Sequence, residues 1–144
     1  MMLCLISILI LMSKAKAKGT AWETECVRYL GDYIFGNIKS FMRLPLSGSK
    51  DVGDIASSYL PEFVFECKNR KDALSSLSMI MRETEKEREN AEADFGVALV
   101  KRRNFGPSGA YVVMEMHQFA QLIKERIEDG GANTSEARNP NSFQ

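Results

Sequence analysis

The alternation of apolar and polar residues along the chain predicts a mixed α/β fold. Its most regular stretch, residues 63–68, reads Phe-Val-Phe-Glu-Cys-Lys, and such a run of aromatic and β-branched residues is typical of a strand. Successive side chains of a strand point to opposite faces of the sheet. We therefore expect one face to carry Phe63, Phe65 and Cys67, and the other Val64, Glu66 and Lys68.

Further elements follow from the same patterns and from the positions of Gly and Pro. They are a helix from Thr20 to just before Gly36, strands over 38–44, 52–56, 95–100 and 111–115, and helices over 73–93 and 118–128. Asp72 is expected to cap the second helix. This order of helices and strands predicts an α/β fold with a central mixed β-sheet flanked by helices.

Strand 52–56 can pair with the strand that follows as a hairpin turning near Leu60. If the two arms are symmetric about that residue, Asp54 lies directly opposite Glu66. Opposed residues have Cβ atoms roughly 4.5–5.5 Å apart, and like charges placed so are destabilising. Mg²⁺ takes hard oxygen ligands and would offset the repulsion. The hairpin thus predicts a metal site at Asp54 and Glu66, with Lys68 beside it to position a water or stabilise phosphate charge.

This arrangement resembles the PD-(D/E)XK nuclease superfamily, and within it the small Holliday-junction resolvases of archaeal type. The resemblance covers residues 18–71 by motifs and the remainder by the order of elements. Its motifs are Lys18-Gly19 before a helix that carries Glu23, then Arg43 and Gly48-Ser49, and finally Asp54 ahead of Glu66-Cys67-Lys68. The departures are Gly53, where the family has proline or an apolar residue, and a second acid, Asp51.

The resemblance implies a restriction-endonuclease-like core that hydrolyses DNA phosphodiesters with Mg²⁺, for which Mn²⁺ can substitute. The implied metal ligands are Asp54, Glu66 and the carbonyl oxygen of Cys67, while Glu23 completes the acidic cluster and Lys68 acts on the attacking water. Branched DNA is the implied partner, and paired nicks imply a homodimer. The alternatives are a restriction-type, repair or phage DNA-processing nuclease of the same core, and an inactive DNA-binding module.

Two acidic positions have a second interpretation. Thr20 and Glu23 form the Thr-x-x-Glu pattern of a capping box, in which the carboxylate would bond to the start of its own helix. The family pattern favours the site for Glu23. Asp54 is preferred over Asp51 as the metal ligand because it begins the apolar strand and has the hairpin register with Glu66.

Charge is distributed unevenly, although the formal net charge at pH 7 is zero. Residues 82–94 hold three basic and six acidic residues, whereas the rest of the chain holds 16 basic and 13 acidic ones. We interpret 82–94 as a solvated helix surface, with Glu83 paired to Lys86 and Glu85 to Arg88. The residues expected to bind nucleic acid are Lys18, Arg43, Ser49, Lys50, Arg70, Lys71, Lys101 and Arg102, with Arg103 on the same basic rim.

The nuclease domain is expected to span residues 18–129. Residues 1–12 are almost wholly apolar, but the run is shorter than the roughly 20 residues that cross a bilayer. We therefore expect a cytoplasmic protein with no membrane partner, in which Met12 is the natural start and 1–17 form an extension. Residues 130–144 have almost no apolar content and predict a disordered tail.

The cysteines and the single histidine carry no predicted chemistry of their own. Cys4, Cys26 and Cys67 lack CxxC spacing, which argues against zinc and against a disulfide framework. His117 has no acid or nucleophile placed to work with it and is expected at the start of the last helix.

Overall fold

The computed structural model describes residues 2–131, which divide into two compact units, one ending at Met114 and the other beginning at Glu115. The predicted disordered tail at 130–144 lies outside the described residues except for Gly130 and Gly131, which belong to the last helix.

Five strands form one mixed sheet, and three helices accompany it in the described part of the chain, so the predicted α/β class is confirmed. The helices are α1 (Met2–Phe35), α2 (Leu77–Asn90) and α3 (Met116–Gly131). The strands are β1 (Met42–Arg43), β2 (Ile55–Ala56), β3 (Phe63–Lys68), β4 (Phe95–Val100) and β5 (Tyr111–Val113), in spatial order β1-β2-β3-β4-β5. β3 and β4 pair parallel through the α2 crossover, and the other pairs are antiparallel.

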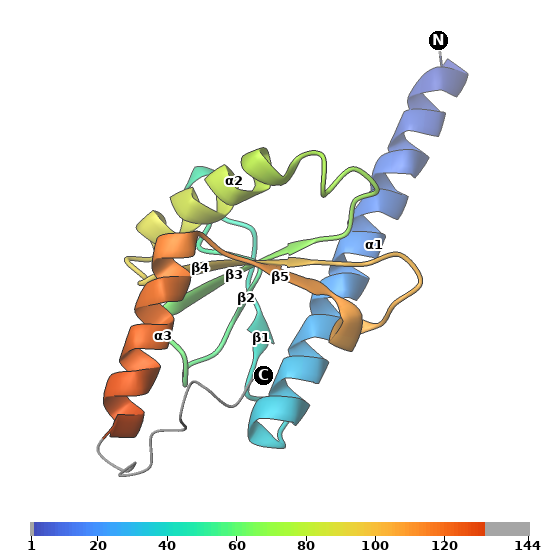
Figure 1. Ribbon diagram of the computed structural model, residues 1–144. Coiled ribbons are helices and arrows are strands. Elements are labelled where there is room, and N and C mark those ends of the chain that lie inside the picture. Colours follow the sequence, from blue (N-terminus) through green and yellow to red (C-terminus); the bar gives the residue numbers. More distant parts are fainter. Residues whose placement is uncertain (1, 132–144) are drawn as a thin grey trace, which may run out of the picture. The chain divides into compact units, whose positions relative to one another are not determined.

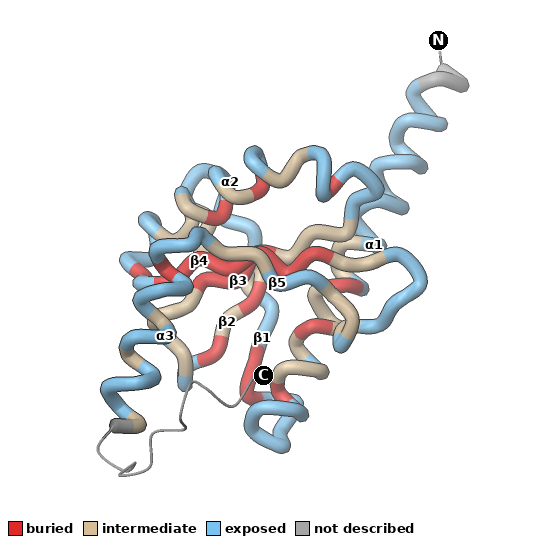
Figure 2. The backbone as a smooth tube through the Cα atoms, in the orientation of Figure 1, coloured by how far each residue is buried: buried red, intermediate tan, exposed pale blue. Residues whose placement is uncertain are grey.

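The two faces of β3 are those expected from its alternation. Phe63, Phe65 and Cys67 pack in the larger apolar cluster, together with Trp22 and Cys26 of α1. The opposite face carries Glu66 and Lys68. Figure 2 shows the buried residues concentrated along the central strands, so the alternation of β3 decides which of two covered faces each side chain enters.

Small residues on β4 let α2 approach the second face closely. A Cβ at Gly96 would lie 3.2 Å from the Thr84 side chain, and Thr84 itself is fully buried. Ala98, which pairs with Glu66, and Val100 form a second apolar cluster with Ile80 of α2. The helix therefore lies directly over the charged face of β3, as Figure 1 shows.

The first helix is longer than predicted, because α1 is continuous from Met2 to Phe35. Thr20 is inside the helix, and its carbonyl accepts a hydrogen bond from the Thr24 hydroxyl at 2.9 Å. The capping-box interpretation of Thr20 and Glu23 is therefore wrong. Lysine and alanine are strong helix formers and Gly19 alone costs only about 1 kcal/mol, so nothing in residues 13–19 ends the helix.

The C-terminus of α1 is closed by a glycine in the left-handed region. Gly36 has φ +61°, and its N–H bonds to the Asp32 carbonyl while the Asn37 N–H bonds to the Gly31 carbonyl. The bond from Gly36 to Asp32 is the single bond of the αL C-cap motif, and the bond from Asn37 adds to it. Gly31 has no room for a side chain, because a Cβ there would lie 2.7 Å from the Asn37 carbonyl oxygen.

Several predicted boundaries are wrong by a few residues. Turns occupy much of the predicted strand 38–44, and only Met42 and Arg43 pair with β2. Helix α2 starts at Leu77, after a run of turns, so Asp72 does not cap it. Asp72 instead accepts hydrogen bonds from the Ser76 N–H and hydroxyl. Strands β3 and β4 have the predicted bounds.

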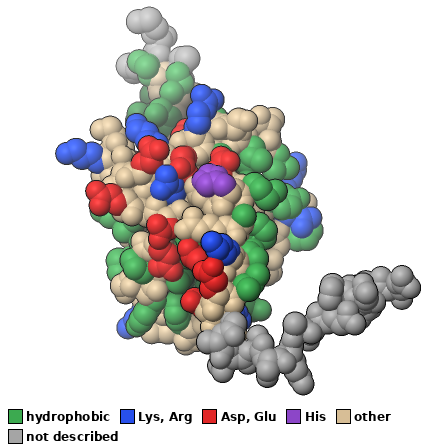
Figure 3. All heavy atoms as spheres, turned by 60° about the vertical axis from the view of Figure 1, so that its left-hand side comes forward, with side chains coloured by type: hydrophobic (Ala, Val, Ile, Leu, Met, Phe, Trp, Pro, Cys, Tyr) green, Lys and Arg blue, Asp and Glu red, His purple; other side chains and the backbone are tan. Residues whose placement is uncertain are grey.

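Helix α3 forms the second unit and begins next to the only histidine. His117 is the second residue of α3, as predicted, and its side chain is exposed (Figure 3). None of the helices in residues 2–131 has a stretch that is both long and apolar enough to span a bilayer.

Trp22 connects α1 to the sheet, and we expect its replacement to destabilise the fold. Its indole N–H donates to the Leu99 carbonyl at 3.0 Å, and the side chain is 1% exposed. Trp22→Phe should lower the free energy of unfolding by roughly 1–3 kcal/mol, because a buried carbonyl loses its partner. Urea denaturation measures this, with Tyr33→Phe, at a position 78% exposed, as the control that should change little.

Candidate active site

The hairpin register brings Asp54 and Glu66 together, as the sequence predicts. Ile55 pairs with Phe65, so the next residues outward are Asp54 and Glu66. The backbone N–H of Asp54 donates to the Phe65 carbonyl at 2.8 Å, and its carboxylate accepts from the Cys67 N–H at 2.7 Å. Asp54 is thus bound to the residues on both sides of Glu66, which orients its carboxylate toward β3.

Gly53, directly before Asp54, lies where the backbone leaves no room for a side chain. It has φ +102°, and a Cβ there would lie 2.9 Å from both the Phe65 carbonyl oxygen and the Val64 side chain. Only glycine fits this close approach without strain. The glycine therefore fixes the path of the chain into Asp54.

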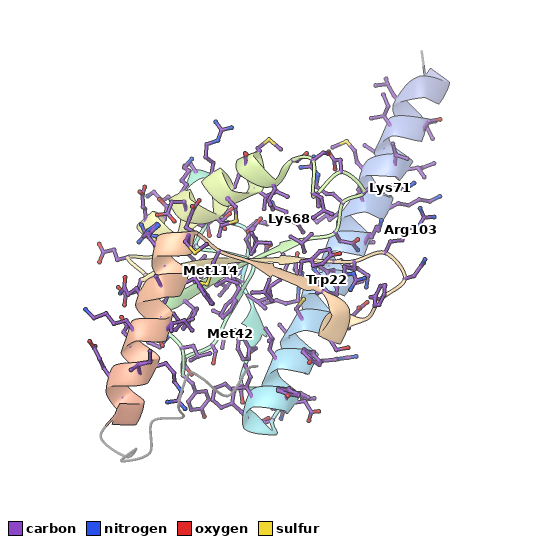
Figure 4. The ribbon with its side chains drawn as sticks, in the orientation of Figure 1. Trp22, Met42, Lys68, Lys71, Arg103 and Met114 are labelled. Atoms are coloured by element: carbon purple, nitrogen blue, oxygen red, sulfur yellow. The ribbon has the colours of Figure 1, made fainter. Side chains whose placement is uncertain are left out.

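Lys68 lies in a network of acids rather than beside a single one. Its ammonium group is 2.5 Å from Glu66 and 2.9 Å from Glu83 of α2. Glu83 therefore pairs with Lys68 of β3 and not with Lys86, the partner expected from the sequence. Glu85 and Arg88 form the predicted ion pair, at 2.6 Å. Figure 4 shows Lys68 between the sheet and α2.

Glu87 of α2 is a site residue that sequence reasoning missed. Its carboxyl group interacts with that of Glu66, and its Oε2 atom is buried without a hydrogen-bond partner among the described residues. Glu83 and Glu87 are one helical turn apart and continue the stripe of Ile80 and Thr84 that faces the sheet. Acids at i+3 and i+7 from a buried Ile are the sequence signal that identifies them. The interpretation of 82–94 as a wholly solvated surface is therefore wrong.

The carboxyl groups of this cluster are hard to ionise together. Burial first, and then the charge of Glu66, raises the pKa of Asp54 to about 7. Burial and the hydrogen bond to Glu87 raise the pKa of Glu66 to about 7, although Lys68 acts in the other direction. Burial also raises the pKa of Glu87. The cluster consequently retains protons at a pH where separate carboxyl groups would be charged.

Lys68 remains an ammonium ion throughout. Burial favours its neutral form, but the attractions of Glu66 and Glu83 outweigh this and raise the pKa of Lys68 above its usual value. A lysine with a raised pKa donates hydrogen bonds and stabilises negative charge; it does not accept a proton from water near neutral pH.

Glu23 lies on the α1 side of the site and is paired with a base. Its carboxylate accepts a hydrogen bond from Arg43 at 2.7 Å, so two residues predicted separately as catalytic and DNA-binding form one ion pair. The negative charge of Glu23 also contributes to the raised pKa of Asp54. Glu23 therefore influences Asp54 through space, while its own oxygen is occupied.

The side chain of Cys67 is turned away from the site. It packs in the larger apolar cluster beside Cys26, and the contact between the two thiols, together with burial, raises the pKa of Cys67. Both cysteines are free thiols. Of Cys67, therefore, the backbone rather than the side chain meets the acidic cluster, through its N–H to Asp54.

The loop at 47–51 is held by hydrogen bonds within itself and to α2. The Asp51 carboxylate accepts the Ser47 N–H, and the Ser49 and Asp51 carbonyls accept the Asn90 amide at 3.3 and 2.9 Å. The predicted phosphate contacts Ser49 and Lys50 are exposed on this loop. Asp51 thus closes the loop, while Asp54 lies across from Glu66.

Most of the remaining predicted DNA-binding residues line one cavity, of about 510 Å³, beyond the ends of β3 and β4. Its basic residues are Lys18, Arg70, Lys71, Lys101, Arg102 and Arg103. Two of these cations are already paired: Arg70 with Asp72 at 2.7 Å and Lys101 with Glu25 at 2.9 Å. The Arg70 hydrogen bond lowers the pKa of Asp72 to about 2.

The donor set of the cluster suits a hard divalent cation, because Asp54, Glu66 and Glu87 supply carboxylate oxygens and repel one another when charged. The unpartnered Glu87 oxygen is a further available donor. As placed, no three His, Cys, Asp or Glu side chains within residues 2–131 form a group that could hold a metal ion. The ion pairs to Lys68 and Arg43 occupy oxygens of Glu66 and Glu23.

Comparison with known proteins supplies no family for this chain. No family model, no curated protein and no solved structure matches it.

The raised pKa values predict that metal-free protein loses stability as pH rises. In the folded state Asp54 and Glu66 release protons near pH 7, whereas their ordinary pKa values are 3.8 and 4.5. The folded state binds more protons in this window, so the free energy of unfolding falls between about pH 4 and about pH 7. Asp54→Asn should therefore raise the thermal unfolding midpoint at pH 8 in chelator and have little effect near pH 4.

The matched control is Asp32→Asn, which changes an exposed aspartate of α1. It should leave the pH dependence of the unfolding midpoint as in the parent protein. An Asp54→Asn variant that is less stable than the parent at pH 8 would contradict the assignment of buried carboxyl repulsion.

Proposed function

We propose that this protein is a Mg²⁺-dependent DNA endonuclease of the PD-(D/E)XK type with a restriction-endonuclease-like core. The proposal is supported by the mixed sheet, in which an antiparallel β2-β3 hairpin precedes a parallel β4 reached through α2. The motif residues Asp54, Glu66 and Lys68 lie together on this hairpin and strand.

The observation that carries the proposal is the opposition of Asp54 and Glu66 across two neighbouring strands. Glu66 is 5% exposed, and its carboxyl group interacts with that of Asp54. Burying two neighbouring carboxyl groups destabilises a fold, because burial and the charge of each group both disfavour ionisation of the other. Such an arrangement is typical of a site that a cation completes.

Asp54 and Glu66 would hold the metal, with the Cys67 carbonyl and Glu87 as additional oxygen donors. Bound Mg²⁺, or Mn²⁺ in its place, supplies polarisation of the scissile phosphate and a lowered pKa for the attacking water. Glu23 adds negative charge at the α1 side and keeps Arg43 in place. The acids of the proposed site thus come from different elements: Glu23 from α1, Asp54 from the residue before β2, Glu66 from β3 and Glu87 from α2.

Lys68 contributes positive charge at the position where the phosphate acquires negative charge. It follows Glu66 by two residues and therefore lies on the same face of β3, and its raised pKa keeps it protonated. It can donate a hydrogen bond to a phosphate oxygen or hold the attacking water in line. Glu66 and Glu83 keep the ammonium group from rotating away.

The substrate favoured by the resemblance is branched DNA, cut by a homodimer in the manner of a junction resolvase. The alternatives with the same chemistry are a restriction-type, repair or phage DNA-processing nuclease. An inactive DNA-binding module is the rival without chemistry, and the presence of Asp54, Glu66 and Lys68 in one cluster argues against it.

Asp54→Asn and Glu66→Gln should each abolish Mg²⁺-dependent cleavage of DNA while binding is retained. Lys68→Ala should slow cleavage by roughly 100- to 1,000-fold, because one charge that stabilises the phosphate is removed. Cleavage is measured on four-way junctions, flaps, linear duplex and single strands, and Asp32→Asn should cut like the parent. Undiminished cutting by Asp54→Asn or Glu66→Gln would overturn the mechanism, whereas equal cutting of all substrates would exclude only the resolvase assignment.

Glu87→Gln tests whether the missed acid belongs to the site. It should reduce cleavage by roughly 10- to 100-fold and raise the Mg²⁺ concentration needed for half-maximal thermal stabilisation. The control is Glu89→Gln, at an exposed position of the same helix. A Glu87→Gln variant with the parent's Mg²⁺ dependence would restrict the role of Glu87 to packing.

A further inference from the structure

The cavity beyond the ends of β3 and β4 has a lining that the acidic site does not use. It measures about 510 Å³, within the usual range for small-ligand pockets. Basic residues dominate the lining, which also contains the two aromatic residues Phe105 and Tyr111 and no acidic residue. The lining therefore offers both charge for a phosphate and aromatic surface for a base.

Part of the positive charge is available to a ligand. Lys18, Lys71, Arg102 and Arg103 form no ion pair with a carboxylate among residues 2–131, unlike the other basic residues of the lining. Figure 4 shows Lys71 and Arg103 near each other beside α1, although they come from different loops. Free cations in a pocket without carboxylates favour an anionic ligand, and phosphate is the anion that Arg and Lys both bind.

The aromatic residues are exposed in spite of their size. Phe105 is 47% exposed and Tyr111 is 41% exposed. The Arg102 guanidinium lies 3.8 Å from the centre of the Phe105 ring and 5.1 Å from that of Tyr111. A guanidinium plane stacked on an aromatic ring presents a flat surface on which a nucleobase can stack.

This flat surface is held by the local backbone. Residues 102–105 form a turn, in which the Phe105 N–H bonds to the Arg102 carbonyl at 3.3 Å and Asn104 has φ +64°. Gly109 passes against the Phe105 ring, since a Cβ there would lie 2.8 Å from a ring carbon. The backbone of Gly109 thus supports one side of the ring, which favours the orientation that a stacked base would need.

The position of the cavity relates it to the acidic site. Asn69, Arg70 and Lys71 of the lining directly follow Lys68 in sequence. A strand of DNA whose phosphate lies at Lys68 can therefore continue into the cavity. In duplex DNA the base faces are covered by neighbouring pairs, so only an unpaired nucleotide can use the aromatic surface.

We propose that this cavity binds one unpaired nucleotide of the DNA strand, with Phe105 and Arg102 stacking its base and Lys71 and Arg103 contacting its phosphate. The inference rests on the proposed function and narrows the substrate to DNA with single-stranded character beside the cleaved bond. Gapped, flapped or branched DNA fits this description, and intact duplex does not.

The experiment measures binding by fluorescence anisotropy in chelator, with a labelled single-stranded oligonucleotide and a duplex of the same sequence. The parent protein should prefer the single strand. Phe105→Leu and Arg102→Lys should each weaken single-strand binding by roughly 5- to 100-fold, the range for loss of one stacked base, and leave duplex binding unchanged. Tyr33→Leu, an exposed aromatic of α1 that does not line the cavity, is the control and should bind like the parent.

An oligonucleotide with abasic residues separates stacking from charge. The parent should bind it weakly, and Phe105→Leu should weaken that binding no further. Equal loss of single-strand and duplex binding in Phe105→Leu, or no loss in either variant, would overturn the proposal. Tighter binding of free deoxyadenosine monophosphate than of the single strand would assign the cavity to a small nucleotide instead.

The design keeps the two proposals apart, because binding in chelator requires no cleavage. A protein that prefers single strands through Phe105 but cuts nothing would retain the cavity assignment and lose the nuclease. A protein that cuts intact duplex as fast as gapped DNA, with Phe105→Leu unaffected, would retain the nuclease and lose the cavity assignment.

Discussion

The mutual repulsion of Asp54 and Glu66 is the interaction on which the rest of the proposed site depends. The hairpin holds the two carboxyl groups together through the backbone, because Asp54 bonds to the Phe65 carbonyl and the Cys67 N–H. Neither acid can move away without breaking strand pairing. Burial raises both pKa values to about 7, the charge of Glu66 adding to the shift of Asp54 and the hydrogen bond to Glu87 adding to that of Glu66, so the free protein exists as a partly protonated cluster. The fold therefore stores an electrostatic penalty that a bound cation can relieve.

The helix that covers this face changes the chemistry of the cluster. α2 approaches closely because Gly96 and Ala98 of β4 are small, and it brings Glu83 and Glu87 toward β3. Lys68 is consequently shared between two acids and held as a cation. A lysine in this state serves as a source of positive charge, which suits phosphate chemistry better than proton abstraction.

The basic surface is divided between structural and available charges. Lys101 lies 4.5 Å from the centre of the Trp22 ring and is paired with Glu25, so it supports the contact of α1 with the sheet. Arg43 performs a similar role for Glu23. Four cations without such partners within residues 2–131, Lys18, Lys71, Arg102 and Arg103, line one cavity with the exposed Phe105 and Tyr111. A chain with zero net charge can in this way present a local phosphate-binding surface.

The sequence by itself determined the strands β3 and β4, the alternation of β3 and the register that opposes Asp54 and Glu66, because period-two patterning and hairpin symmetry are local properties. It did not determine where α1 begins, since the helix formers before Thr20 carry no stop signal. It also placed Glu87 in solvent, because charged residues on a helix are usually exposed and only the packing of α2 on Gly96 buries an oxygen of this side chain. Glu83 is exposed as expected, but its ion pair with Lys68 was not foreseen. The grouping of basic and aromatic residues into one cavity was likewise decided by tertiary structure, as it joins α1 with two loops far apart in sequence.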